Sequence, residues 1–321
     1  MKPTFRTSRW MVSAAPSVAI ELAAGRVTVA EFSGSAASPA ISAFASEPIA
    51  RDALIPSLMA TNITQPQVVS AALRVALDRA GLRSARRAAL ILPDSVARVS
   101  MLRFEEVPRN AVDLEQLIRL QLKKGTPFPI EDAKLSIVPA HKDGQATMMA
   151  VSLARKEVIA EYEALAASAG IHTGVVDLAS FNVMNALIAS GSVPSADWLL
   201  VCLTAEATTL AILRGDALMF YRHRGNVDDE PLGALVHQTA MYHEDRLGGS
   251  RFARIWLCGG AYSAGGAARV SAEISAKLDV PVEAVDFRKS ATLRSQIDVT
   301  PDVLDALAAS VGVLLRERRA A

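Results

Sequence analysis

One order of secondary-structure patterns occurs twice in this chain, and it restricts the fold more than any single motif does. Residues 18–93 contain three β-rich runs, a helical pattern and a continuously apolar run, in that order. Residues 198–258 repeat the order strand, strand, strand, helix, strand. A supersecondary unit that occurs twice predicts an α/β protein made of two similar lobes. In such a fold, the turns between the first two strands of each lobe face one shared cleft.

Each copy contains the local signals on which this interpretation depends. The stretch Val18–Phe32 consists of two short β-rich runs around a small-residue turn at Gly25. Residues 88–93 (AALILP) are continuously apolar, which is typical of a strand buried on both faces of a sheet. In the second copy, residues 198–213 give two more β-rich runs, and residues 254–258 (RIWLC) give another buried strand.

The stretch between the two copies has a different pattern, which predicts strand, helix, strand, strand, helix. A helix that begins near Asp113 ends at Gly125, and a rigid loop with two prolines follows. The last helix of this stretch is amphipathic. We therefore expect residues 1–93 to form the first lobe, 94–175 an inserted α+β subdomain, 176–197 the connecting helix of the first lobe, and 198–321 the second lobe with a C-terminal helix.

Charge, cysteine and histidine content exclude several classes of protein. The chain has 34 Lys and Arg against 33 Asp and Glu, so its net charge of +1 gives no overall attraction to nucleic acid or to an anionic membrane. Cys202 and Cys258 lie far apart in apolar runs, which is typical of buried thiols in a reducing compartment. His237 and His243 do not share a helix face, so no metal site is predicted.

The N-terminus is the one segment that suggests export. Lys2, Arg6 and Arg9 precede an apolar stretch at residues 10–20, an arrangement that loosely resembles a signal peptide. However, Pro16 and neighbouring serines interrupt the stretch, which then continues into a strand-like alternation. No window of the sequence is long and apolar enough for a membrane span. We therefore expect a cytoplasmic protein.

Several short segments follow one another in an order and spacing that resemble a known family. They are Leu92-Pro93-Asp94-Ser95, the loop Thr126-Pro127-Phe128-Pro129-Ile130-Glu131-Asp132, residues 154–158 (ARKEV), Leu257-Cys258-Gly259-Gly260-Ala261, and Gly312 with Leu314, Leu315 and Arg316. Together these segments resemble the PilM family of type IV pilus assembly proteins, within the actin-like superfamily, over nearly the whole chain. The resemblance implies a duplicated two-lobed actin-like (ribonuclease H-like) fold with an inserted small α+β subdomain.

The resemblance also implies a role. Members of the PilM family are cytoplasmic, and a groove between the inserted subdomain and the first lobe receives the cytoplasmic N-terminal tail of the inner-membrane protein PilN. On this basis we expect Pro127, Phe128 and Pro129 to shape the partner-binding groove, because prolines hold a loop rigid. The alternative interpretation is that Phe128 fills the junction with the first lobe.

The expected phosphate loops depart from the pattern of the family. In the first loop, Glu21 keeps the acidic residue that works with Mg²⁺, but Ala23 replaces a glycine and Thr28 replaces a lysine. In the second loop, Cys202 replaces the carboxylate, and of the family's pattern only Thr208 remains. A thiol does not substitute for the hard oxygen ligands that Mg²⁺ prefers.

Two further features concern the same site. Gly259 and Gly260 resemble the superfamily's adenosine-side loop, although two glycines also suit a tight turn from strand to helix. Only residues 222–231 bridge a gap in which family members carry a closing subdomain, so we expect that subdomain to be reduced or absent. We therefore expect a degenerate nucleotide site at Glu21, Thr208, Gly259 and Gly260, with no enzymatic activity and no cofactor; ATP with Mg²⁺ is the alternative.

Three functions follow from this reasoning. The preferred one is a non-catalytic scaffold of type IV pilus assembly, which lies at the inner membrane through a PilN-like protein and other pilus proteins. The second is a cytoplasmic platform component of type II secretion. The third is an active actin-like ATPase. The first is preferred because the two loops lack the residues that hold phosphate.

Overall fold

The computed structural model describes residues 16–35, 38–225, 231–260, 266–294 and 297–320. Two sequence expectations therefore lie partly outside the described residues: the N-terminal apolar stretch before Pro16, and the middle of the bridge between Arg222 and Pro231. Within the described part, no helix is long and apolar enough to cross a membrane.

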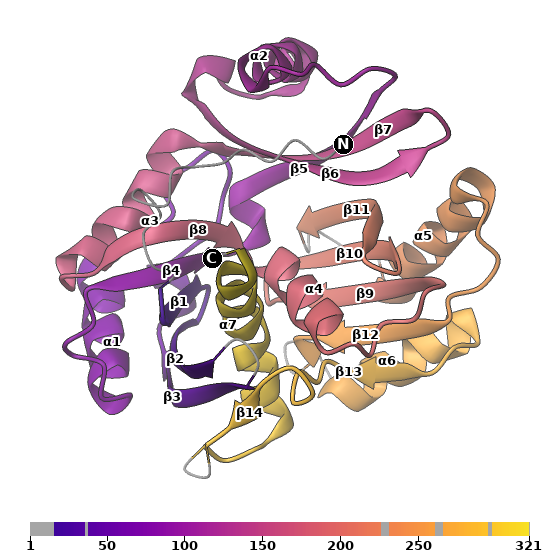
Figure 1. Cartoon of the computed structure of the whole chain (residues 1–321). Helices are drawn as coiled ribbons and strands as arrows, with labels where there is room; N and C mark the ends of the chain where they lie inside the picture. Colours follow the sequence, from indigo (N-terminus) through magenta and orange to yellow (C-terminus); the bar gives the residue numbers. More distant parts are fainter. Residues whose placement is uncertain (1–15, 36–37, 226–230, 261–265, 295–296, 321) are drawn as a thin grey trace.

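The first lobe is built on a mixed sheet of six strands (Figure 1). The order is β14-β3-β2-β1-β4-β8, in which β1, β2 and β3 are antiparallel neighbours and β4 and β8 run parallel to β1. The turn between β1 and β2 requires Gly25, because its φ of 85° is unfavourable for residues with a side chain. The strands are β1 (Val18–Ala23), β2 (Arg26–Ser35), β3 (Ser38–Pro48), β4 (Arg87–Leu92), β8 (His172–Leu178) and β14 (Thr292–Leu293).

The second lobe repeats this plan in a separate sheet of five strands. The order is β11-β10-β9-β12-β13, so β9 to β12 occupy the places that β1 to β4 have in the first sheet. The predicted duplication is confirmed, with α1 (Pro66–Arg79) and α5 (Leu232–Leu247) as the equivalent helices. The strands are β9 (Asp197–Leu203), β10 (Ala207–Arg214), β11 (Ala217–Gly225), β12 (Arg254–Cys258) and β13 (Val282–Ala284).

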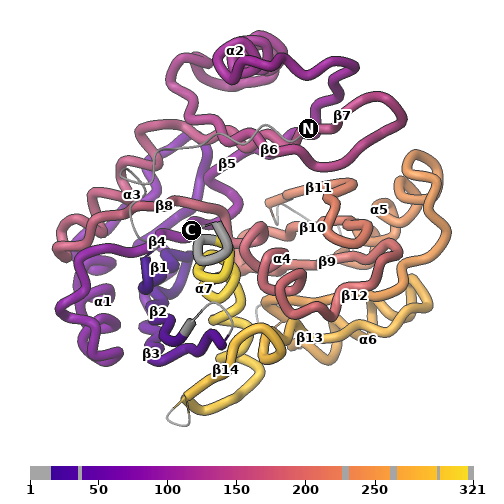
Figure 2. The backbone as a smooth tube through the Cα atoms, viewed as in Figure 1, coloured from indigo at the N-terminus to yellow at the C-terminus, as the bar shows by residue number. Residues whose placement is uncertain are grey.

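Two helices, α4 (Ala179–Ala189) and α7 (Pro301–Ala320), lie between the two sheets (Figures 1 and 2). They belong to a buried cluster that contains side chains of both sheets, among them Ala19 of β1 and Trp198 of β9. The helices approach each other most closely at Gly312, where a Cβ atom would lie 1.7 Å from the carbonyl oxygen of Asn182. On the outer faces, α1 covers the first sheet, and α5 with α6 (Gly266–Leu278) covers the second.

The inserted subdomain is smaller than the range 94–175 that the sequence suggested. Its sheet has the order β5-β7-β6 and packs on α2 (Ala111–Leu122) around Ile118 and Met149. Helix α3 (Lys156–Ser168), which we expected in this subdomain, instead packs on α1, and its Tyr162 lies in the core of the first lobe. Strand β8 follows and pairs with β4, so this unit ends with β7. Its strands are β5 (Ala97–Phe104), β6 (Ala133–Asp143) and β7 (Ala146–Arg155).

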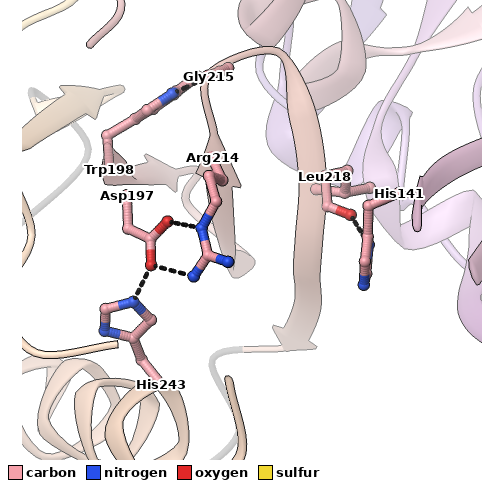
Figure 3. A network of polar contacts seen from close by, with 7 residues as sticks. All are labelled: His141, Asp197, Trp198, Arg214, Gly215, Leu218 and His243. Carbon is pink, nitrogen blue, oxygen red and sulfur yellow. Dashed lines mark hydrogen bonds and ion pairs between the residues drawn. The ribbon is translucent and has the colours of Figure 1, made fainter. Parts of the chain in front are cut away.

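The physical reason for this difference is that an amphipathic helix packs on whichever apolar surface lies nearest. For α3 that surface is provided by Val69 and Leu73 of α1, far away in the sequence. The inserted subdomain also contacts the second lobe. His141 Nδ1 donates a hydrogen bond of 2.7 Å to the carbonyl oxygen of Leu218 on β11 (Figure 3). The three-stranded sheet therefore spans both lobes.

A buried polar network joins α5 to the first residue of β9 (Figure 3). Asp197, which is 8% exposed, accepts hydrogen bonds from Nε and Nη2 of Arg214 at 2.6 and 2.9 Å. Its Oδ2 also lies 2.6 Å from Nε2 of the buried His243. The hydrogen-bonded Arg214 guanidinium holds the pKa of Asp197 below its usual value, so the carboxylate stays charged in the fold.

The Asp197→Ala substitution is expected to lower the free energy of unfolding by about 3 kcal/mol, because it leaves His243 buried without its partner. We choose the low end of the range of losses measured when a buried ion pair is broken, because Arg214 is half-exposed. Urea denaturation followed by circular dichroism measures the change. Arg251→Ala is the control, because it removes only an exposed ion pair with Asp279 and should leave stability nearly unchanged. Equal losses in the two variants would contradict a special role for the network.

Candidate functional site

The predicted phosphate loops meet between the lobes, at a small cavity. The C-terminal ends of β1, β4, β9 and β12 converge there, and α4 and α7 close the cavity. Its volume is about 60 Å³. Its polar lining includes Glu21, Asp94, Thr209, Glu206 and Asp305. Residues from both lobes therefore line one small hollow.

Two of the four residues predicted for a nucleotide site line this cavity. Glu21 and Gly259 lie on its wall. Thr208 is displaced by one position, because side chains of a strand alternate between the two faces of a sheet, and Thr209 is the residue that lines the cavity. Gly260 lies against the first turn of α6, where a Cβ atom would meet another side chain at 2.6 Å.

Gly259 is required by the packing of the backbone. Its φ is 75°, and a Cβ atom would lie 1.8 Å from the carbonyl oxygen of Leu203 on β9. Its amide donates a hydrogen bond of 2.6 Å to Oδ2 of Asp305 on α7. A backbone donor of the kind that holds phosphate in glycine-rich loops is thus already taken by a carboxylate of the chain itself.

Burial raises the pKa of three carboxyl groups in the cavity. Glu21 is only 6% exposed, and this burial raises its pKa. Arg26, whose Nη2 lies 3.4 Å from Glu21 Oε2, partly offsets the rise. Burial likewise raises the pKa of Glu206 and of Asp305. Asp94 is a fourth carboxyl group in the lining, and burial disfavours the charged form of the other three.

Asp94, at the start of the short helix η2 (Asp94–Val96), connects elements of both lobes. Its Oδ1 accepts hydrogen bonds from the amide and the hydroxyl of Ser180 at 3.1 and 2.9 Å, and its Oδ2 accepts one from Thr209 Oγ1 at 2.8 Å. Thr209 Oγ1 lies 2.8 Å from Nδ1 of His223, whose Nε2 lies 3.0 Å from Ser95 Oγ. This network was not predicted from the sequence, because its contacts join residues 86 to 128 positions apart along the chain. The exception is the pair Thr209 and His223, which both belong to the second lobe.

The residues at this cavity do not fit Mg²⁺-ATP. Cavities that bind small molecules usually measure about 300–1,000 Å³, whereas this one measures about 60 Å³. Cys202 presents a thiol at the wall, and a thiol is not a ligand that Mg²⁺ prefers. In the described part of the chain, no group of three or more His, Cys, Asp and Glu side chains is placed to hold a metal ion.

A larger hollow, which we call the groove, lies between the inserted subdomain and the first lobe. Its volume is about 490 Å³. One wall comes from β6 and β7, the other from α3 and β8, and both β6 and β8 are edge strands of their sheets. At the groove's rim are Lys134, Glu163 and an ion pair between Asp177 and Arg316. The apolar lining includes Val96, Leu135, Val138, Ile159, Val176 and Phe181.

The proline loop at Pro127, Phe128 and Pro129 does not line this groove. Phe128 is half-buried in a cluster with Ile130 and Leu153 of the inserted subdomain and Leu58 of the first lobe. Phe128 therefore lies at the junction between the inserted subdomain and the first lobe. The residues that line the groove were not predicted from the sequence, because its walls come from four separate elements.

Comparison with known proteins gives one family. The family model described as "Type IV pilus assembly protein PilM" matches residues 19–228. No curated protein matches the chain. The first solved structure is the PilM-PilN type IV pilus biogenesis complex, at 19% identity and a TM-score of 0.78, with 95% of this chain and 99% of that chain covered. This likeness confirms the predicted two-lobed fold.

Other solved structures are more distant. The cytoplasmic domain of EpsL, an inner membrane component of the type II secretion system of Vibrio cholerae, matches at 10% identity and a TM-score of 0.49, covering 95% of this chain and 94% of that chain. A Bacteroides thetaiotaomicron protein with an actin-like ATPase fold matches at 9% identity and a TM-score of 0.48, covering 91% and 94%.

The Gly259→Ala substitution is expected to destabilise the protein far more than Gly266→Ala. Both glycines have a φ of 75°, so alanine costs about 1–2 kcal/mol at either position for the left-handed backbone. At Gly266 no atom of the described residues beyond its chain neighbours lies within 4 Å of the added Cβ, whereas at Gly259 the Cβ overlaps the carbonyl group of Leu203. Urea denaturation measures both variants. Similar losses would mean that Gly259 is not packed against β9.

His223 is expected to make the stability of the fold pH-dependent. Burial lowers its pKa from the usual 6.5, although the nearby Asp94 carboxylate partly offsets this. The unfolded chain therefore binds this proton more tightly than the folded one. The contribution of His223 to stability is full above pH 6.5 and is lost as the pH falls below that value.

The measurement is the free energy of unfolding in urea from about pH 7 to about pH 5, for the natural chain and for His223→Gln. As the pH falls, the natural chain should lose stability more steeply than His223→Gln does. The carboxyl groups of Glu21, Glu206 and Asp305, whose pKa values are raised, act with the opposite sign in both proteins and cancel in the comparison. Parallel pH profiles would contradict the assignment.

Proposed function

The chain belongs to the PilM family of type IV pilus assembly proteins, and from this premise we propose that it is a scaffold that binds the cytoplasmic tail of a PilN-like inner-membrane protein. The observation that carries the proposal is the groove between the inserted subdomain and the first lobe. In the similar solved structure, PilM is in a complex with PilN. The chain would then act in the cytoplasm and reach the inner membrane through this partner.

The groove suits an extended peptide because it lies between two sheet edges. Strand β8 is the last strand of the first sheet, and β6 is the last strand of the inserted sheet. A peptide that adds a strand at such an edge gains main-chain hydrogen bonds, and every second side chain points into the groove. This geometry favours a short extended segment over a folded partner.

The chemistry of the groove indicates which segment would fit. Its lining is mostly apolar, and Val138 on β6 is 46% exposed there without a partner residue to cover it. Lys134 and Glu163 provide charges of opposite sign at the rim. We therefore expect a peptide with apolar side chains on one face, held in register by charged or polar groups on the other.

We further propose that the protein works without ATP hydrolysis. Support comes from the cavity of about 60 Å³, from Cys202 at a position where a Mg²⁺ ligand is expected, and from the Gly259 amide bonded to Asp305. The family match favours pilus assembly over a platform of type II secretion. Turnover of Mg²⁺-ATP that is lost in Glu21→Ala would overturn the non-catalytic part of the proposal and support the ATPase alternative.

Val138→Asp is expected to weaken binding of a labelled synthetic peptide with the N-terminal sequence of the PilN-like partner by about tenfold or more, because a carboxylate would have to be desolvated against apolar side chains. Fluorescence anisotropy measures the affinity. The matched control is Val112→Asp on α2, where the valine is 59% exposed and does not line the groove. Its affinity should equal that of the natural chain.

A third variant separates the groove from the proline loop. Phe128→Ala should lower the stability of the fold while the folded protein keeps its affinity, because Phe128 packs on Leu58 and Leu153 and lies outside the groove. Loss of affinity in a folded Phe128→Ala protein, with unchanged binding by Val138→Asp, would place the partner at Pro127, Phe128 and Pro129 instead.

A further inference from the structure

We propose that Asp94 and its partners form a clasp that holds the two lobes together in place of a nucleotide. The clasp consists of Asp94, Ser95, Ser180, Thr209 and His223. It occupies the wall of the interlobe cavity, so it concerns a different site from the groove and does not depend on what the groove binds.

The contacts of Asp94 cross between the lobes. Asp94 lies two residues after the end of β4 in the first lobe, and Thr209 belongs to β10 of the second lobe. Each carboxylate oxygen has its own role: Oδ1 accepts from the amide and hydroxyl of Ser180 on α4, and Oδ2 accepts from Thr209 Oγ1 at 2.8 Å. A carboxylate with three donors at 2.8 to 3.1 Å is well satisfied. Opening the lobes would therefore break the charge-assisted hydrogen bond from Thr209 to Asp94, together with the contact between Ser95 and His223.

The direction of the remaining hydrogen bonds follows from the number of protons. Thr209 has one hydroxyl proton and donates it to Asp94, so toward His223 it acts as an acceptor. Nδ1 of His223 is therefore the donor in that contact. In the neutral ring, Nε2 is then an acceptor, and the Ser95 hydroxyl donates a hydrogen bond of 3.0 Å to it. The hydrogen bonds thus run from Asp94 through Thr209 on β10 and His223 on β11 to Ser95, the residue that follows Asp94.

A second contact lies beside the first. The hydroxyl groups of Ser180 and Tyr221 are 3.0 Å apart, and the ring of Tyr221 stacks on Phe181 with centroids 5.3 Å apart. Tyr221 belongs to β11 and is buried, whereas Ser180 and Phe181 belong to α4. Both contacts hold β10 and β11 to the same end of α4, so they strengthen the same interface.

This arrangement differs from one in which a ligand closes two lobes. A ligand that binds only the closed state adds stability that grows with the logarithm of its concentration. Here, side chains of the protein make the contacts between the lobes, and the remaining cavity is about 60 Å³. The closed arrangement is therefore a property of the chain alone, and the groove beside the first lobe keeps its shape in the absence of nucleotide.

The experiment compares the natural chain with Thr209→Val, which removes the central hydroxyl and keeps the shape of the side chain. Hydrogen exchange followed by mass spectrometry should show exchange about tenfold faster or more near Asp94 and Ser180 in the first lobe, as expected when a hydrogen bond to a charged group is lost. In the natural chain, millimolar Mg²⁺-ATP should change neither the exchange nor the melting temperature.

Thr239→Val is the matched control, because the hydroxyl of Thr239 is buried and donates to the carbonyl oxygen of Leu235 within α5. Its exchange should change only in the second lobe. If Thr209→Val does not fold, Ser95→Ala removes only the last hydrogen bond and should give a smaller change in the same segments. Unchanged exchange near Asp94 in the folded variant, or a melting temperature that rises with Mg²⁺-ATP in the natural chain, would overturn the proposal. Peptide affinity at the groove is measured separately, so failure of the clasp and failure of the proposed function give different results.

Discussion

The close contact between α4 and α7 determines how near the two lobes lie to each other. At Gly312 the backbone of α7 meets the carbonyl group of Asn182 with no room for a side chain. Because protein interiors are close-packed, this contact fixes the position of both helices between the sheets. The strand ends of the two lobes then converge on one small volume, in which carboxyl, hydroxyl and imidazole groups satisfy one another.

The interlobe cavity and the groove differ in size and in how their polar groups are bonded. The interlobe cavity is small, and Asp94, Thr209 and Asp305 in its lining are bonded to groups of the chain itself. The groove is larger, mostly apolar and bounded by two edge strands. Buried polar groups without partners are costly, so the internal hydrogen bonds of Asp94, Thr209 and Asp305 stabilise this part of the fold. The apolar side chains of the groove form no such bonds, and exposed apolar patches often mark interaction sites.

Much of the fold could be predicted from the sequence, since it depends on local patterns. The hairpin at Gly25, the buried strand β4 and the repeated order of elements all have signals within a few residues. Strand β8 has no such signal: its sequence HTGVVDL is half-buried at a sheet edge and becomes a strand by pairing with β4. The site was harder to predict because it depends on register. Thr208 and Thr209 are equally plausible in the sequence, and only the alternation of β10 decides which one faces the cavity.

Helix α7 has one further consequence. It carries Asp305 at the interlobe cavity and Arg316 at the groove, where Arg316 pairs with Asp177 of β8. Eleven residues of helix separate the two, which corresponds to about 16 Å along a stiff rod. One continuous helix therefore contributes side chains to both hollows. Its two ends lie in different chemical environments, one among buried carboxyl groups and the other at a mostly apolar groove.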